Sequence, residues 1–167
     1  TLVNASVSVE PPMFVDVVNV TSAADMADVV KSKAAEQDII IMTAAVADFC
    51  PSHPADEKIK KNDSSYESVI ELERTEDILS YLGAHKAKGQ LICGFSMETQ
   101  NMLENSKAKL AKKNADMIVA NNLKVAGAGF GADTNLVTLI PADDCTELEI
   151  MDKSCVAARI IDRLLQM

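Results

Sequence analysis

Residues 38–48 read DIIIMTAAVAD. The first seven of them, 38–44, are almost entirely apolar with little alternation, which is typical of a central parallel strand covered on both faces. Small residues and the carboxylate of Asp48 follow, so a ligand can approach the backbone where the strand ends. The basic segment EKIKK comes soon after, at residues 57–61. Together, the open strand end and the lysines predict a site for an anionic ligand.

The whole chain has the composition of a globular domain with a sizeable core. It has 167 residues, of which 48% are hydrophobic and 25% charged, and its formal net charge is -9. The acidic balance argues against a nucleic-acid surface, and an anionic substrate would need a local basic patch. No apolar run approaches the roughly 20 residues of a membrane span. No basic-then-apolar leader opens the sequence, so we expect a cytoplasmic protein.

The cysteines are expected to be buried, reduced thiols. None forms a CxxC pair, and the chain has only two histidines, so no zinc spacing exists and no metal site is expected. The four cysteines are Cys50, Cys93, Cys145 and Cys155.

Strand-like and helical segments alternate along the chain. Thr21 or Ser22 is expected to cap the first helix, with Asp25 returning a hydrogen bond as in a capping box. Two short charged strands at 58–61 and 67–73, joined by the polar turn NDSS, predict a protruding ribbon. Other strands are expected at 1–4, 14–20, 38–44, 90–95, 116–120, 135–140 and 147–150, a loop at 48–56, and further helices at 75–86, 98–114 and 152–165. The inward face of the last helix is expected to contain Val156, Ile160, Ile161 and Leu164.

This alternation predicts a layered α/β domain with a largely parallel sheet. In such sheets, ligands bind outside the carboxyl ends of the strands. The strand ends at 42–48, 95–99 and 120–122 are therefore the first places to expect functional residues.

Several side chains near these ends suit a nucleotide or phosphate, and each also has a structural interpretation. Asp48 could accept hydrogen bonds from a ribose or base, or cap a loop. Lys58 could neutralise a reacting phosphate or keep an exposed strand edge solvated. Lys109 and Lys113 share a helix face and could grip phosphates, or complement the helix dipole. Phe95 could stack on a base or fill the core.

A glycine-rich stretch at residues 127–131 reads GAGFG, which is GxGxG rather than GxGxxG. A strand-like segment follows it, whereas dinucleotide binding needs the N-terminus of a helix there. An NAD-dependent oxidoreductase is therefore not supported.

Six motifs occur in order: AAVADFCP at 44–51, EKIKK at 57–61, RTEDIL at 74–79, GFSMET at 94–99, KLAKKNADMIVAN at 109–121 and GFGADTN at 129–135. Together they resemble phosphopantothenoylcysteine synthetase, the second domain of the bacterial bifunctional coenzyme A biosynthesis flavoprotein. The resemblance covers essentially the whole chain. KIKK is similar to the bacterial form that uses CTP rather than to the eukaryotic form that uses ATP.

The resemblance implies a three-layer, Rossmann-like domain that ligates 4'-phosphopantothenate to cysteine. An acyl-cytidylate forms from CTP with release of pyrophosphate, and cysteine then displaces CMP, with Mg²⁺ offsetting the triphosphate charge. The family is a homodimer, which implies that the ribbon serves dimerisation. An upstream flavin-dependent decarboxylase domain is a further expected neighbour.

The family's motifs also imply roles for individual residues. Lys58 would form the acyl-cytidylate, and the small Ala45 would lie against it. Phe95 would pack on cytosine. CTP would be contacted by Met42, Thr43, Ala44, Asp48, Lys58, Glu76, Asp77, Ile78 and Leu79, and its phosphates by Lys109 and Lys113.

The family's first strand, its glycine-rich loop and an asparagine that handles the acyl-cytidylate are expected to precede residue 1. We therefore expect residues 1–167 to form a single ligase domain that lacks those parts. The alternative is a catalytically silent fragment that binds nucleotide or forms the dimer.

Overall fold

The computed structural model describes residues 1–167 except 6, 8, 59–68, 99 and 123–130. The chain divides into two compact units, and each is described by itself. The first contains Thr1–Val30 and Ala45–Asp77, and the second contains Lys31–Ala44 and Ile78–Met167.

The first unit contains two small sheets and the start of a helix. β1 (Leu2–Ala5) and β2 (Val17–Val20) pair in parallel. β4 (Phe49–Pro51) and β5 (Leu72–Arg74) pair antiparallel, although we expected a loop at 49–51. The expected ribbon strand at 58–61 and the NDSS turn lie almost wholly outside the described residues.

Helix α1 (Ala23–Ala34) begins with the expected capping box. The backbone N–H of Ser22 donates to Oδ2 of Asp25, and the N–H of Asp25 donates to Oγ of Ser22. Hydrogen bonds from Thr21, and then from Ser22, hold the pKa of Asp25 below its ordinary value of 3.8.

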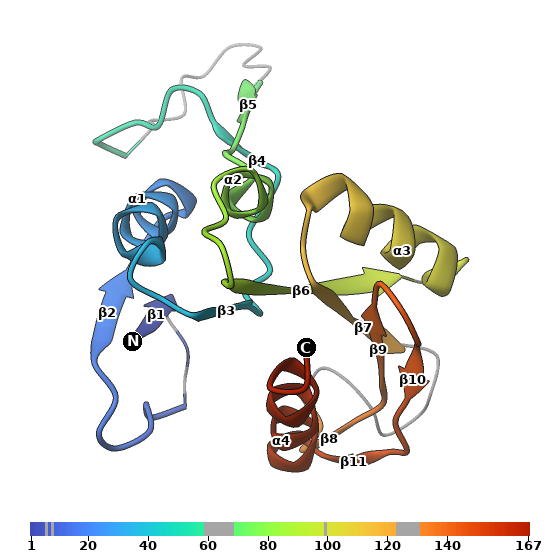
Figure 1. The fold of residues 1–167 in the computed structure, drawn as a ribbon. Helices are drawn as coiled ribbons and strands as arrows, with labels where there is room; N and C mark the ends of the chain where they lie inside the picture. Colours follow the sequence, from blue (N-terminus) through green and yellow to red (C-terminus); the bar gives the residue numbers. More distant parts are fainter. Residues whose placement is uncertain (6, 8, 59–68, 99, 123–130) are drawn as a thin grey trace. The chain divides into compact units, whose positions relative to one another are not determined.

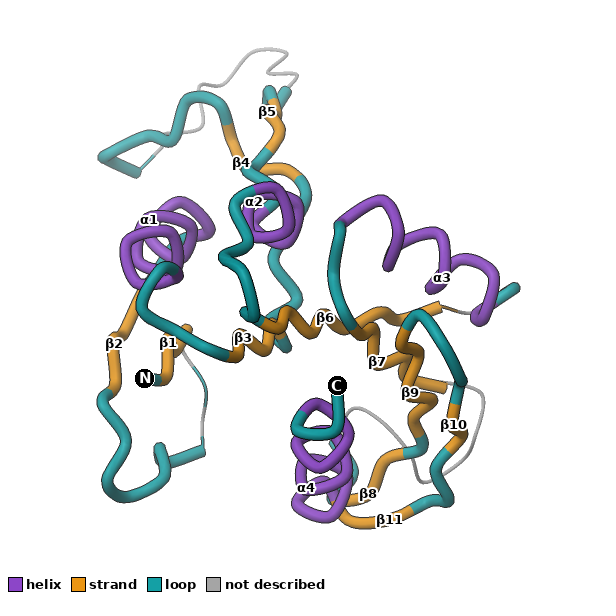
Figure 2. Tube along the Cα trace, in the orientation of Figure 1, coloured by secondary structure: helices purple, strands orange, loops and turns teal. Residues whose placement is uncertain are grey.

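The second unit is built on a five-stranded sheet (Figure 2). β3 (Ile39–Met42), β6 (Leu91–Glu98) and β7 (Met117–Asn122) run in parallel, and β9 (Val137–Pro141) and β10 (Thr146–Glu147) extend the sheet with antiparallel pairings. The order is β10-β9-β7-β6-β3. A separate short pair joins β8 (Thr134–Asn135) to β11 (Met151–Asp152).

Helices cover both faces of this sheet (Figure 1). α2 (Ile78–Ala84) and α3 (Met102–Lys113) lie on one face and α4 (Lys153–Leu164) on the other. The expected mixed α/β fold, with three layers, is therefore confirmed in this unit.

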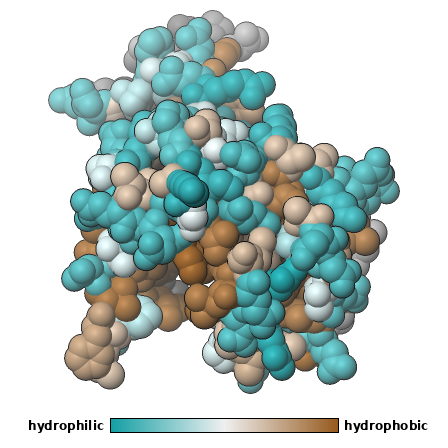
Figure 3. Space-filling model, in the orientation of Figure 1, coloured by the Kyte–Doolittle hydropathy of each residue, from teal (hydrophilic) through white to brown (hydrophobic). Residues whose placement is uncertain are grey.

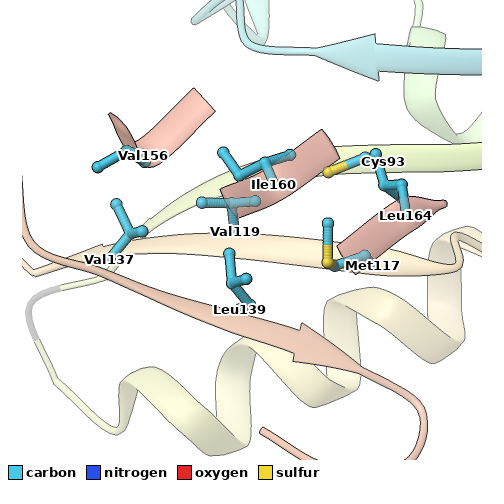
Figure 4. Close-up of a cluster of buried hydrophobic side chains, with 8 residues drawn as sticks. All are labelled: Cys93, Met117, Val119, Val137, Leu139, Val156, Ile160 and Leu164. Carbon is cyan, nitrogen blue, oxygen red and sulfur yellow. The ribbon is translucent and has the colours of Figure 1, made fainter. Parts of the chain in front are cut away.

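The buried core follows from alternation along β7, since successive strand side chains point to opposite faces. Ile118 and Ala120 pack with Leu110 and Ile140 on the α3 face. The cluster on the α4 face is drawn in Figure 4 and contains Cys93, Met117, Val119, Val137, Leu139, Val156, Ile160 and Leu164.

Three expectations about burial are wrong. β3 is an edge strand of the five-stranded sheet, with Ile41 37% exposed, although its sequence predicts a central strand. Ile161 is exposed because α4 buries the i, i+4, i+8 row that starts at Val156. Of the four free cysteines only Cys93 is buried, whereas Cys155 is exposed. Burial and, second, the charge of Asp116 raise the pKa of the Cys93 thiol to about 12.

Several element boundaries also differ from the expected ones. α2 begins at Ile78 rather than at residue 75, because the N–H of Thr75 is bonded to the carbonyl of Asp48 and extends the β4–β5 ladder. α3 begins only at Met102 because β6 stays paired as far as Glu98. The strand expected at 147–150 is wrong, since β10 ends at Glu147 and the next pairing begins at Met151.

The surface is mixed in character. Figure 3 shows hydrophilic and hydrophobic side chains interspersed over the face that it draws. Among the described residues, no helix is both long and apolar enough to cross a bilayer.

The packing of α2 on α3 generates a test of the fold. A Cβ added at Gly83 would lie 1.8 Å from the carbonyl oxygen of Lys113, so Gly83→Ala must separate the helices. Overpacking of this kind costs about 1–3 kcal/mol. Without the clash, alanine would stabilise a helix interior by about 1 kcal/mol relative to glycine. We expect urea denaturation to show a lower free energy of unfolding for Gly83→Ala.

Gly89→Ala is the control, because Gly89 has a φ of 83° and nothing within 4 Å of an added Cβ. Its cost of roughly 1–2 kcal/mol comes from the strain of a left-handed alanine, and the contact between α2 and α3 should stay unchanged. A Gly83→Ala variant as stable as the wild type would contradict the close approach of α2 to α3.

Candidate functional site

The parallel strands of the second unit bring three strand ends to one edge of the sheet. Met42, the last residue of β3, lies opposite Gly94 of β6, and Met97 of β6 lies opposite Asn121 of β7. Because the three strands run in the same direction, their carboxyl ends share this edge. In this unit the expected gathering of strand ends is confirmed, with Thr43 and Ala44 exposed just beyond β3.

Gly94 lets the start of α2 lie close over β6. A Cβ at Gly94 would be 2.6 Å from Cδ2 of Leu79, so only a residue without a side chain fits here unless that leucine shifts. Ile78 is 4% exposed and Leu79 is half-buried, which anchors the first turn of α2 in the core. Ile78 and Leu79 therefore place the first turn of α2 over β6, next to Gly94.

The two lysines of α3 turn towards the same region. Nζ of Lys109 donates to the backbone carbonyl of Phe95 at 2.8 Å. Nζ of Lys113 donates to Oγ of Ser80 on α2 at 3.0 Å. Both lysines are half-buried, so they are not simply a solvated helix face. Lys112 and Lys113 also occupy the last turn of α3, where they complement its dipole.

A buried pair of hydroxyls holds α3 against β6. Oγ of Ser96 and Oγ of Ser106 are 2.8 Å apart, and both residues are almost fully buried. Ser96 follows Phe95 on the strand, and Ser106 precedes Lys109 by one helical turn. This pair therefore sets where Lys109 meets the strand end.

The first unit carries the remaining predicted residues. Ala45 and Asp48 are exposed in the loop before β4, and Glu76 and Asp77 are exposed after β5. Thr75 joins these two segments: its N–H donates to the carbonyl of Asp48 at 3.0 Å, and its hydroxyl donates to the carbonyl of Ala47. Lys58 is exposed between β4 and β5, and the rest of KIKK lies outside the described residues.

The predicted residues thus form two groups, each within one unit. Phe95 and Lys109 are in direct contact, and Lys113 contacts the residue that follows Leu79. The second unit contains Met42, Thr43, Ala44, Ile78, Leu79, Phe95, Lys109 and Lys113, and the first contains Ala45, Asp48, Lys58, Glu76 and Asp77.

Reasoning from the sequence missed the hydroxyls that support these groups. Thr75 was assigned to the start of a helix, and Ser80, Ser96 and Ser106 were not singled out. A signal existed for Ser106 alone, because a serine one turn before Lys109 falls on the face that meets the sheet. The other contacts depend on how separate elements pack.

The electrostatics suit an anion rather than a metal ion. Lys109 and Lys113 supply positive charge in a chain of net charge -9. Within the described ranges, no three or more His, Cys, Asp or Glu side chains group together so as to hold a metal ion. Lysine ammonium groups can bind a phosphate, whereas the ring of Phe95 packs against the buried cluster on the α4 face.

Comparison with known proteins gives concordant matches over the whole chain. A model of the family described as "DNA/pantothenate metabolism flavoprotein C-terminal domain" matches residues 1–167. The chain is 46% identical over 165 residues to the coenzyme A biosynthesis bifunctional protein CoaBC of Bacillus subtilis (strain 168), covering 98% of the chain and 40% of that protein. It is 44% identical over 167 residues to a cysteine/cysteine sulfinic acid decarboxylase of an unknown prokaryotic organism, covering 99% and 46%.

The solved structures agree. A crystal structure of the C-terminal domain of a CoaBC protein has a TM-score of 0.79 and 40% identity, and the match covers 99% of this chain and 74% of that one. The chain spans less than half the length of the two relatives above.

The Ser96–Ser106 pair can be tested by a double-mutant cycle. Ser106→Ala leaves the Ser96 hydroxyl buried without its partner, which costs about 1–3 kcal/mol, and Ser96→Ala should cost a similar amount. The double variant should be little less stable than either single variant, because no hydroxyl then lacks a partner. Chemical denaturation measures all four free energies. Strictly additive losses would contradict the direct bond.

Proposed function

The chain belongs to the family of DNA/pantothenate metabolism flavoprotein C-terminal domains, and on that premise we propose that it is a CTP-dependent phosphopantothenate–cysteine ligase of coenzyme A biosynthesis. The observation that carries the proposal is the hydrogen bond from Nζ of Lys109 to the backbone carbonyl of Phe95 in β6, with half-buried Lys113 one turn away. These residues lie in motifs that resemble the CTP-using synthetases. The likeness to CoaBC proteins supports the same step.

In the proposed first step, a carboxylate oxygen of 4'-phosphopantothenate attacks the α-phosphorus of CTP. The bond from that phosphorus to the bridging oxygen breaks, pyrophosphate leaves with the electron pair, and an acyl-cytidylate forms. Lys58 stabilises the charge that develops on the phosphate oxygens. The absence of a side chain beyond Cβ at Ala45 leaves room for the acyl group.

In the second step, the amine of cysteine attacks the acyl carbon. The bond between that carbon and the phosphate oxygen breaks, CMP leaves, and the amine loses a proton as the amide forms. The chain's part in this step is to hold the activated acyl group in place for the amine, which replaces a bimolecular encounter by an oriented one.

The proposed contacts with the nucleotide follow from the family motifs. Phe95 packs on cytosine, and Asp48 accepts a hydrogen bond from the ribose or base. Lys109 and Lys113 contact phosphate oxygens; an ammonium has three donors, so the bond to Phe95 leaves Lys109 able to reach an anion. Backbone groups of Met42, Thr43, Ala44, Glu76, Asp77, Ile78 and Leu79 complete the contacts.

Mg²⁺ is proposed as the companion of CTP. Among the described residues, no three or more His, Cys, Asp or Glu side chains group together as metal ligands. Mg²⁺ is commonly held by substrate phosphates with one or two carboxylates. By family resemblance, we further propose a homodimer joined through the ribbon expected at residues 58–73, in which Leu72 is exposed.

The relative named as a decarboxylase suggests a second candidate, the loss of CO₂ from a cysteine-type substrate. That reaction has no phosphate for Lys58, Lys109 and Lys113 to bind, so we assign ligation to this region.

The two activities differ in whether they require CTP. CO₂ release from cysteine without CTP would favour the decarboxylase, whereas the amide product requires CTP. CTP binding without any product would favour the silent fragment.

The role of Lys58 gives a direct test in the natural full-length chain. Lys58→Gln removes the charge near the reacting phosphate, so phosphopantothenate-dependent pyrophosphate release should fall by on the order of 10²–10³. Circular dichroism should stay unchanged, because Lys58 is exposed.

Lys88→Gln is the matched control, because Lys88 is also exposed and lies in the turn before β6. It should keep the wild-type rate. If both variants release pyrophosphate at that rate, Lys58 has no part in forming the acyl-cytidylate.

A further inference from the structure

Thr75 connects two segments to which we assign nucleotide contacts. β4 and β5 are paired with Phe49 opposite Arg74, so Asp48 and Thr75 stand one position beyond the ladder. The N–H of Thr75 donates to the carbonyl of Asp48 at 3.0 Å, which continues the strand pairing into the loop. The hydroxyl of Thr75 donates to the carbonyl of Ala47. All of these residues belong to the first unit.

The two bonds differ in what they require of the sequence. Every residue except proline can supply the backbone N–H. The bond to the Ala47 carbonyl needs a short side chain with a hydroxyl, which among common residues means threonine or serine. The two bonds hold the carbonyls of Ala47 and Asp48 in place. Because these carbonyls flank the Cα atom of Asp48, the direction of its Cα–Cβ bond is held as well.

Burial shows that the hydroxyl is not needed for the core. Thr75 is only partly buried, and Ala47 and Asp48 are exposed. Water can replace the hydroxyl as partner of an exposed carbonyl at little cost in folding free energy. The contact is therefore suited to ordering a loop rather than to stabilising the domain.

We propose that Thr75 is a positioning residue for the nucleotide: its hydroxyl holds residues 47 and 48 in the conformation in which Asp48 meets CTP. The inference rests on the proposed function, in which Asp48 on one side of Thr75 and Glu76 and Asp77 on the other contact the same ligand. Because both segments contact the nucleotide, loss of the hydroxyl affects CTP and leaves phosphopantothenate and cysteine bound as before.

The experiment compares Thr75→Val, which replaces the hydroxyl by a methyl group of similar size, with Thr75→Ser, which keeps it. Thr146→Val is the control, since it removes the hydroxyl of an exposed threonine on β10. Steady-state kinetics in the natural full-length chain give a separate KM for CTP, phosphopantothenate and cysteine. The Tm of each variant is measured alongside.

We expect Thr75→Val to raise the KM for CTP about 3- to 10-fold, the value of one hydrogen bond. The other two KM values and the Tm should stay near wild type. Thr75→Ser and Thr146→Val should match the wild type. The proposal is overturned if Thr75→Val leaves the KM for CTP unchanged, if Thr75→Ser is equally impaired, or if all three KM values rise together with a fall in Tm.

A second measurement, amide hydrogen exchange without ligands, tests the clamp, by which we mean the two hydrogen bonds from Thr75 to Ala47 and Asp48. It does so independently of any reaction. Exchange of the amide of residue 75, which donates to the Asp48 carbonyl, should be faster in Thr75→Val than in the wild type, and slow again in Thr75→Ser. If exchange is unchanged in Thr75→Val, the Thr75 hydroxyl does not order this loop, and the proposal is overturned even if CTP is the substrate. Faster exchange in a protein that neither binds nor uses CTP keeps the clamp but overturns both its nucleotide role and the proposed function.

Discussion

The side chains of β7 alternate between two buried clusters, and the second unit is organised by this double burial. Ile118 and Ala120 pack beneath α3, whereas Met117 and Val119 pack beneath α4, and all four are 0% exposed. A strand buried on both faces needs a helical layer on each side and neighbours along both edges, because its backbone groups have no water to bond. The three layers, the parallel pairing with β6 and the antiparallel pairing with β9 all meet that need.

The proposed site uses the one edge of the sheet where this burial ends. The carboxyl ends of the parallel strands β3, β6 and β7 lie along this edge, with β6 and β7 extending beyond the end of β3. Polar contacts take over from apolar packing there. Ser96 and Ser106 fix the helix on the strand, and Lys109 meets the carbonyl of Phe95. The lysines can be held in place without burying an unpaired charge, because each ammonium has an oxygen partner in the protein.

The sequence predicted best those features that depend on one helix or strand alone. The apolar run at residues 38–44 predicted β3, and helical spacing predicted an inner face of α4 that is correct for Val156, Ile160 and Leu164 but not for Ile161. Prediction from the sequence failed for features that depend on how two elements pair or pack, such as strand order. An apolar run indicates covered faces but not which strands bond to its edges, so β3 was expected inside the sheet that it borders. Thr75 was assigned to a helix because its pairing with Asp48 joins segments 27 residues apart in sequence.

The motifs identified the family, and the structure adds how their residues are supported. The proposed function requires that the carboxylate of phosphopantothenate is activated at the α-phosphate of a cytidine nucleotide. The direct measurement uses phosphopantothenate labelled with ¹⁸O in that carboxylate, together with CTP, Mg²⁺ and cysteine. Mass spectrometry of the products should find one ¹⁸O in the phosphate of CMP and none in pyrophosphate. Label in inorganic phosphate or pyrophosphate, or amide formed without any transfer to CMP, would contradict the account.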